Sequence, residues 1–264
     1  MKFETLKVDV DGSIGRLTLS RPEKLNPLGA TTLRELGEAA RWFDGQSGVR
    51  VVILRGEGRA FSAGADLRDP SLGMASPDSG KPWHERREVG QLGLRMVEAV
   101  EQMRATTIAQ VHGYAIGGAL LLMMACDLRI AAENAVFSIP EVDIGIPLAW
   151  GGIPRLVREI GPALTKELVM TCRRFTPAEA RAAGLVNRVV PEAALAEQVE
   201  KLAAELAAKP SVPVIITKEH VNAVARAMGA GLTGFADGDT LIGAGLDPAS
   251  REAALAYSRR TFKK

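Results

Sequence analysis

Two short glycine-containing segments have residues whose types and spacing could stabilise a developing negative charge. Residues 62–66 (SAGAD) and the pair Gly117–Gly118 each follow a run that predicts a buried strand, and each is expected to open a helical turn. Two such turns could direct two backbone N–H groups at one oxygen and form an oxyanion hole, in which each donor contributes roughly 3–4 kcal/mol. The alternative is a pair of glycine-rich turns packed inside a core.

The elements around Gly117–Gly118 organise the rest of the chain. Residues 106–111 (TTIAQV) are β-branched and predict a buried strand, and residues 119–126 are apolar on all sides, as in a helix buried within a large core. A strand, a tight glycine turn and a buried helix leave free N–H groups at the helix N-terminus, where negative charge is favoured. Residues 51–54 (VVIL) predict a second strand, buried on both faces, that leads into residues 56–66.

The remaining pattern predicts strands alternating with helices, followed by helices alone. Strands are expected at 3–10 and 14–20, joined by a hairpin turn at Asp11–Gly12, and at 128–132, 136–138 and 185–190. Helices are expected after a cap at Thr31 or Thr32, along an apolar stripe from Val89 to Met103, through residue 156, and at 163–172, 177–183 and 191–208. Residues 68–85 predict a loop of the length that often serves as a lid. From residue 212 only helices are expected, with interruptions near 229–231 and 247–248, so the chain reads as an α/β core with a helical C-terminal region.

Composition narrows the class of protein. The 264 residues are 47% hydrophobic, enough for a sizeable core, and the net charge of +2 gives no reason to expect nucleic acid as a partner. No apolar run predicts membrane insertion, and no signal peptide is expected at the N-terminus, so a cytoplasmic protein is predicted. The three histidines are scattered, which argues against a metal site. A dinucleotide-binding glycine motif is excluded because the position of its third glycine holds Phe61.

Several motifs together resemble the crotonase, or enoyl-CoA hydratase/isomerase, family. They are GEGRAFSAGADL (56–67), GYAIGGA (113–119) and CDLRIA (126–131), supported by RPEKLN (21–26), PEVDIG (140–145) and ARAAGLV (180–186). The resemblance implies a spiral core of repeated ββα units over residues 1–195, and a helical region over 196–264 that builds homotrimers or homohexamers. It also implies an acyl-CoA thioester substrate, with coenzyme A as part of that substrate and no separate cofactor.

The resemblance assigns roles to individual residues. Two backbone amides that hold the thioester enolate oxygen match Ala65 and Gly118. Ala63 matches the backbone contact to adenine, and Lys24 and Leu25 match the segment that lines the CoA groove. Asp66, the last residue of the segment 62–66, is expected to cap a helix start. Trp150 falls at the wall of the acyl pocket, where it either shapes the substrate site or belongs to the core.

One departure from the family pattern decides between reactions. Hydratases of the family carry two glutamates, of which the second matches Glu141, whereas the first falls on Leu121. A missing acid–base group typically lowers the rate by ~10²–10⁴-fold, so efficient hydration is not expected. The two additional aspartates of dienoyl-CoA isomerases fall on Leu121 and Leu148, which argues against that activity as well.

A single carboxylate is sufficient for a 1,3-proton shift, so isomerisation of a 3-enoyl-CoA to a 2-enoyl-CoA, with Glu141 as the base and then the acid, is the favoured reaction. Leu121 is expected to raise the pKa of Glu141 by desolvation. Asp143 is a weak candidate, expected to face the other way in an extended segment. The alternatives are a hydratase with an atypical site, a non-catalytic acyl-CoA-binding protein and, last, other enolate chemistry such as decarboxylation.

Overall fold

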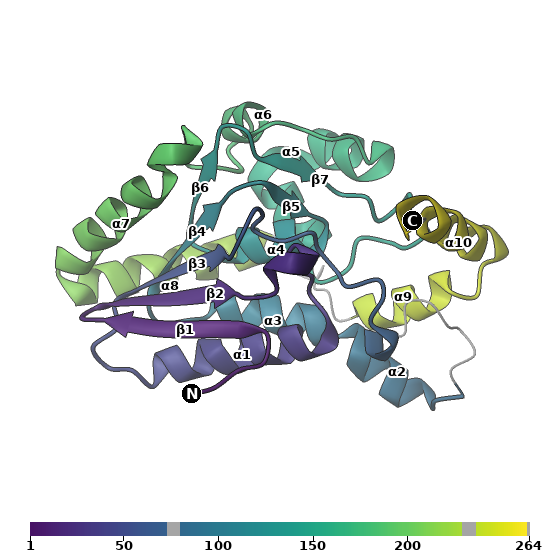
Figure 1. Cartoon of the computed structure of the whole chain (residues 1–264), viewed down its shortest axis with the longest axis horizontal. Helices are drawn as coiled ribbons and strands as arrows, with labels where there is room; N and C mark the ends of the chain where they lie inside the picture. The colour runs from purple at the N-terminus through teal and green to yellow at the C-terminus, as the bar shows by residue number, and fades with distance from the viewer. Residues whose placement is uncertain (73–79, 229–235, 263–264) are drawn as a thin grey trace.

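The fold is built on one large sheet and one small sheet, as the computed structural model in Figure 1 shows. The structure describes residues 1–72, 80–228 and 236–262. The larger sheet has the order β1-β2-β3-β4-β6-β8, with strands Leu6–Asp11, Ile14–Leu19, Val51–Gly56, Thr106–Val111, Leu128–Ala132 and Arg188–Val190. Strand β1 is antiparallel to β2, and every later neighbour in this sheet is parallel. The smaller sheet pairs β5 (Tyr114–Ile116) with β7 (Val136–Ser138).

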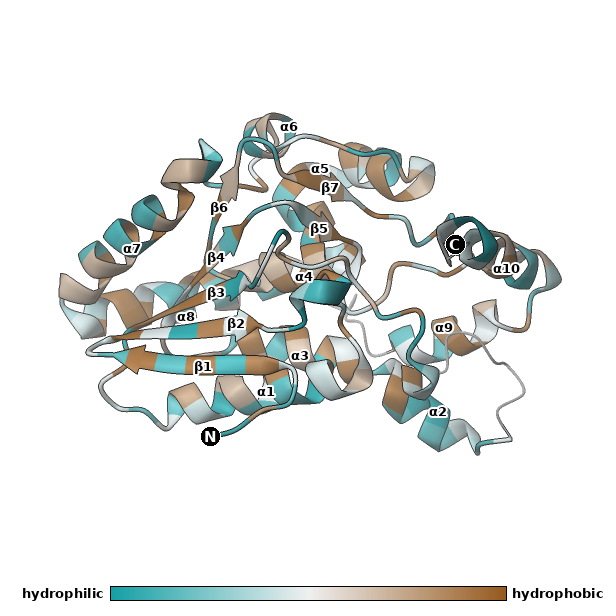
Figure 2. Cartoon of the chain, in the orientation of Figure 1, coloured by the Kyte–Doolittle hydropathy of each residue, from teal (hydrophilic) through white to brown (hydrophobic). Residues whose placement is uncertain are grey.

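The sheet forms where the sequence is richest in β-branched and apolar residues. Strands β1 and β2 make the expected hairpin, in which Asp11 pairs with Ile14 and Gly12 takes the left-handed φ of 57° that the tight turn requires. Figure 2 shows brown and teal alternating along β1, as expected for a strand with one solvated face. In β3, by contrast, the first four residues are all buried, as predicted from the run VVIL.

The two faces of β3 pack into different clusters. Val52 and Leu54 belong to the main core, which also holds α1 (Ala30–Asp44), α3 (Leu92–Glu101) and α4 (Gly118–Ala125). Val51 and Ile53 pack instead with α7 (Glu192–Ala208), on the other side of the sheet. All eight residues of α4 are buried, so the prediction of a core helix after Gly117 is confirmed.

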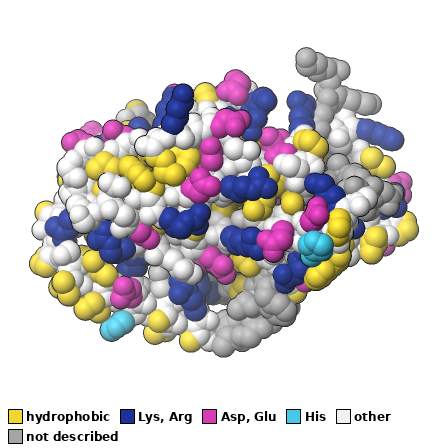
Figure 3. All heavy atoms as spheres, turned by 90° about the horizontal axis from the view of Figure 1, so that it is seen from below, with side chains coloured by type: hydrophobic (Ala, Val, Ile, Leu, Met, Phe, Trp, Pro, Cys, Tyr) yellow, Lys and Arg dark blue, Asp and Glu magenta, His cyan; other side chains and the backbone are white. Residues whose placement is uncertain are grey.

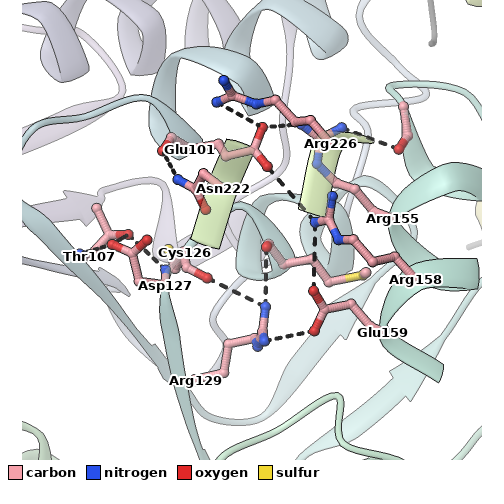
Figure 4. Close-up of polar contacts among 12 residues, drawn as sticks. Glu101, Thr107, Cys126, Asp127, Arg129, Arg155, Arg158, Glu159, Asn222 and Arg226 are labelled. Carbon is pink, nitrogen blue, oxygen red and sulfur yellow. Dashed lines mark hydrogen bonds and ion pairs between the residues drawn. The ribbon is translucent and has the colours of Figure 1, made fainter. Parts of the chain in front are cut away.

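The C-terminal region is helical, as predicted, with α8 (Ser211–Met228), α9 (Asp237–Ala244) and α10 (Pro248–Phe262). No residue of helix α8 is fully buried, and polar contacts attach the helix to the core. The Lys218 ammonium lies 2.7 Å from Asp127, and the Asn222 amide donates to the carbonyl of Glu101. Figure 4 shows Arg226 of the same helix reaching toward the Glu101 carboxylate, at 3.8 Å.

Three further helices complete the described chain: α2 (Trp83–Gly90), α5 (Gly152–Thr171) and α6 (Pro177–Ala182). Helix α5 joins the two helices expected on either side of residue 160, and it kinks at Gly161, whose φ is 76°. Two short 3₁₀ turns, η1 (Pro22–Lys24) and η2 (Pro70–Leu72), lie in the loops. No helix within the described ranges is long and apolar enough to cross a bilayer.

Several local predictions were wrong. Helix α1 is not capped by Thr31 or Thr32: Gly29 is the N-cap, and the Asp69 carboxylate accepts the N–H of Ala30 at 2.7 Å. The Thr32 side chain is buried because it lies on the core side of α1. Residues 68–85 are not one loop, since η2 interrupts them and α2 begins at Trp83. Their middle part, 73–79, and the interruption expected at 229–231 lie outside the described residues.

One face of the molecule carries charges of both signs. Figure 3 shows Lys and Arg mixed with Asp and Glu over the face seen from below, with no large area of one sign. This distribution agrees with the net charge of +2 and gives no electrostatic footprint for a polyanion on that face.

Candidate active site

The two glycine segments singled out in the sequence lie side by side. Ser62 forms a parallel bridge with Ala115, and the N–H of Ser62 donates to the carbonyl of Tyr114 at 2.9 Å. A Cβ on Gly64 would stand 2.3 Å from the carbonyl oxygen of Ile116 and 3.7 Å from the nitrogen of Gly118. The backbones approach this closely because Gly64 has no side chain and has a φ of 89°.

Two backbone N–H groups at this junction have no acceptor within the part of the chain that the structure describes. Among the described residues, neither Ala65 nor Gly118 donates a backbone hydrogen bond, although their neighbours Asp66 and Gly117 do. Gly118 is the first residue of α4, where an N–H has no partner within the helix. Both residues line the same cavity, so both can serve an oxygen placed between them.

Hydrogen bonds of Asn26 fix the turn that carries Ala65. This buried side chain accepts the N–H of Arg21 and donates to the carbonyls of Glu57 and Ala60, each at 2.9 Å. The hydroxyl of Ser62 adds a hydrogen bond to the carbonyl of Asn26 at 2.7 Å. Residues 62–66 are therefore a fixed loop and do not open a helix as predicted.

Glu141 places a carboxyl group against the start of α4. It lies in the turns that follow β7, and a Cβ on Gly117 would stand 2.6 Å from its Oε1. Its Oε2 is buried without a hydrogen-bond partner among the described residues. Desolvation by burial raises the pKa of Glu141 from 4.5 to about 7. Near neutral pH this group can therefore both accept and return a proton.

The other walls of the cavity are apolar. Leu121, Leu148 and Trp150 line it together with Glu141, which is the only acid among the lining residues that the structure describes. A Cβ on Gly152 would stand 2.9 Å from both Leu121 and Leu148, so these two leucines close one side of the site. The space that they leave is small, about 50 Å³.

The residues expected to contact coenzyme A lie around the Ala65 turn. The N–H of Ala63 donates to the carbonyl of Leu25 at 2.9 Å, so these two positions are neighbours, and Lys24 is exposed beside them at the end of η1. Asp66 does not cap a helix, because no helix begins there; its carboxylate pairs with Arg21 at 3.2 Å. Asp143 lies in a turn rather than an extended segment, and it is exposed and pairs with Arg260.

Asp237 is a residue that the sequence did not single out. Its carboxylate accepts the N–H of Gly151 at 2.7 Å, next to Trp150 and more than eighty residues away along the chain. Desolvation raises the pKa of Asp237, which is half-buried. No motif surrounds this aspartate in the sequence. Its place near the site follows from the tertiary structure, in which α9 packs against α2.

A family model described as "Enoyl-CoA hydratase/isomerase" matches residues 9–239. The chain belongs to this family. The predicted resemblance is thereby confirmed, and the match covers both donor segments and Glu141.

Relatives within the enoyl-CoA hydratase/isomerase family include a probable enoyl-CoA hydratase of Rhizobium meliloti, 38% identical over 224 residues, or 84% of this chain and 82% of the relative. A crotonyl-CoA hydratase of Syntrophomonas wolfei is 35% identical over 223 residues, with coverage of 84% and 83%. The crystal structure of an enoyl-CoA hydratase/isomerase from Xanthobacter autotrophicus superposes with a TM-score of 0.87 at 28% identity, covering 98% of this chain and 94% of that one. The crotonase fold is thus confirmed.

Proposed function

We propose that this protein moves the double bond of a 3-enoyl-CoA to the 2-position, with Glu141 as the only acid–base group. The observation that carries the proposal is one buried carboxyl group, whose Oε2 has no hydrogen-bond partner among the described residues, facing a cavity whose other described lining residues are not acidic. Leu121 occupies the neighbouring wall, where a second carboxylate would be needed to activate water. A single carboxylate of this kind suits a proton shift between two carbons of one substrate.

The reaction uses the three groups in sequence. The Glu141 carboxylate removes a proton from C2 of the thioester, and the electron pair moves onto the thioester oxygen to give a dienolate. The N–H groups of Ala65 and Gly118 donate to that oxygen. Protonated Glu141 then returns the proton to C4, the C3=C4 bond becomes C2=C3, and the carboxylate is regenerated.

The pKa of Glu141 supports this double role. A group with a pKa of about 7 has comparable amounts of both forms at neutral pH, so neither removing nor returning the proton is strongly unfavourable. The apolar side chains of Leu121, Leu148 and Trp150 also keep water from the dienolate, and exclusion of water strengthens the two N–H donors.

Hydration of a 2-enoyl-CoA is the second candidate, because several relatives have names that describe hydratases. In that reaction the attacking water must lose a proton and C2 of the substrate must gain one. The cavity offers Glu141 alone for both tasks among its described lining residues. A protein that binds acyl-CoA without turnover is the third candidate.

The proposal includes a homotrimer or homohexamer that works in the cytoplasm with no cofactor beyond the CoA of the substrate. Support for assembly comes from α8, which buries none of its residues and exposes Val212, Val221 and Val224 by about 60% each. Light scattering coupled to size-exclusion chromatography tests the assembly.

A paired turnover assay tests the reaction. One arm supplies a 3-enoyl-CoA and the other a trans-2-enoyl-CoA, with products separated by chromatography, for the wild type, Glu141→Gln and the exposed-site control Glu38→Gln. Conversion in the first arm alone, lost only in Glu141→Gln, supports the isomerase. Fast hydration in the second arm would establish the hydratase, and binding without turnover in either arm would leave the binding protein.

A further inference from the structure

The indole of Trp150 lies directly over the start of α4. A Cβ on Gly118 would stand 2.2 Å from its Cζ3, and a Cβ on Gly93 of α3 would stand 2.0 Å from its ring. The ring is therefore packed between two glycines from different helices, one of which provides an oxyanion donor. No larger side chain at either glycine could coexist with the ring in this position.

The backbone of Trp150 is held in a conformation that bulky residues rarely adopt. Its φ is 56°, and that of the following Gly151 is 67°. A left-handed conformation at a large residue persists only where the surroundings impose it, because it costs on its own. Contacts made by the Trp150–Gly151 segment therefore impose this conformation.

Two charged side chains form hydrogen bonds with the backbone of Gly151. Asp237 of α9 accepts its N–H at 2.7 Å, and Arg155 of α5 donates to its carbonyl at 3.2 Å. Figure 4 shows Arg155 fixed in turn by the Glu101 carboxylate, at 2.8 Å, and both side chains of this pair are at least nine-tenths buried. Trp150 is thus held over the cavity by elements that are distant in sequence.

The space left beneath the ring is small. The cavity lined by Ala65, Gly118, Glu141 and Trp150 has a volume of about 50 Å³. A cavity of ~150 Å³ binds the six carbons of benzene, so the space beside Glu141 accommodates on the order of two carbons. The indole, and not the two leucines alone, closes the pocket above Gly118.

We propose that Trp150, positioned by Asp237, ends the acyl pocket and restricts this protein to short acyl chains, because the space beside Glu141 accommodates only on the order of two carbons. This inference rests on the proposed acyl-CoA substrate and adds its chain length. Trp150 determines specificity by contact with the acyl chain, and Asp237 is a positioning residue that acts through Gly151.

Binding of saturated thioesters tests the inference without requiring isomerisation. Butanoyl-, hexanoyl- and decanoyl-CoA, with free CoA as a reference, are titrated calorimetrically into the wild type, Trp150→Ala, Trp150→Phe and Trp83→Ala. Trp83 is the matched control because it is an exposed tryptophan on α2. We expect the wild type and Trp83→Ala to bind decanoyl-CoA at least tenfold more weakly than butanoyl-CoA. Trp150→Ala should abolish this preference, and Trp150→Phe should relax it for hexanoyl-CoA.

Two variants test the positioning role of Asp237. Asp237→Ala loses the acceptor for the Gly151 N–H and should reduce the preference for butanoyl-CoA, whereas Asp237→Asn keeps an oxygen acceptor and should retain it. Affinity for free CoA should stay constant in all variants. Rescue by the asparagine separates positioning of Trp150 from a general effect on folding.

The outcomes separate this inference from the proposed function. Equal binding of butanoyl- and decanoyl-CoA by the wild type, or an unchanged preference in both Trp150 variants, would overturn the chain-length role while leaving an acyl-CoA substrate in place. Failure of every thioester to bind more tightly than free CoA would overturn both. A preference that survives in Asp237→Ala would remove Asp237 from the inference.

Discussion

The stability of Glu141→Gln relative to the wild type should increase as the pH rises. The folded state raises the pKa of Glu141 from 4.5 to about 7 because the carboxyl group is desolvated, so it binds this proton more tightly than the unfolded chain does. Stability is therefore lost as the pH rises from 4.5 toward 7, and the loss is complete above the folded-state pKa. At ~1.4 kcal/mol per pKa unit the loss is roughly 3 kcal/mol. A glutamine has no proton to lose, so Glu141→Gln avoids this loss.

Unfolding by urea at pH 5 and at pH 8.5 measures the difference. Relative to the wild type, Glu141→Gln should gain about 3 kcal/mol between the two pH values, equivalent to a rise of ~6–12 °C in Tm for a protein of this size. The control Glu38→Gln, at an exposed position of α1, should follow the wild type. The same pH dependence in Glu141→Gln and in the wild type would refute the conclusion that Glu141 is a desolvated carboxyl group.

Four further outcomes follow from the site. In the isomerase assay, kcat/KM should rise with pH through a midpoint near 7, because the base is the deprotonated carboxylate; a midpoint near 4.5 would assign the base to a solvated acid. Glu141→Gln should lower turnover ~10²–10⁴-fold while CoA affinity, followed by calorimetry, is unchanged; retained activity would remove Glu141 from the mechanism. Gly118→Pro deletes one donor and should lower kcat at least ~10²-fold, with circular dichroism as the check on folding; normal turnover by the folded variant would disprove the oxyanion assignment. Arg155→Met leaves the Glu101 carboxylate without its closest partner and should destabilise the protein by ~3–5 kcal/mol in thermal unfolding, whereas a near-zero change would show that Arg158 and Arg226 replace it.

The sequence predicted the elements whose signal is local. The hairpin at Asp11–Gly12, the strand Thr106–Val111, the buried helix after Gly117 and the strands Leu128–Ala132 and Val136–Ser138 depend on runs of apolar residues and on glycines, and the structure has each of them. The family resemblance depended on short motifs of the same local kind, and the family is confirmed. The roles of Ala65, Gly118 and Glu141 stay predictions, although the structure brings all three to one cavity.

The predictions that failed depended on partners far away in the chain. A threonine near the start of α1 fits the usual capping rule, but Asp69 reaches the first free N–H of the helix from a different loop. Asp66 was expected to cap a helix, whereas Arg21 lies close enough to take its carboxylate. Asp237 could not be found at all, because its partner is a backbone N–H some 86 residues earlier. Such contacts are set by tertiary packing, and no periodicity in the sequence encodes them.

The donors proposed for the thioester oxygen, the N–H groups of Ala65 and Gly118, belong to the main chain, and this has an evolutionary consequence. A substitution of the Ala65 side chain, other than to proline, leaves its N–H in place. Substitutions of the surrounding side chains, such as a leucine at position 121, can therefore change which reaction follows from the enolate. The two backbone N–H donors are kept through such substitutions. Selection must act instead on Gly64 and Gly117, where a methyl group would stand 2.3 Å from the carbonyl oxygen of Ile116 and 2.6 Å from the Glu141 carboxylate. In this scaffold the position of the two proposed donors depends on two glycines, whereas the choice of product depends on the side chains that line the cavity.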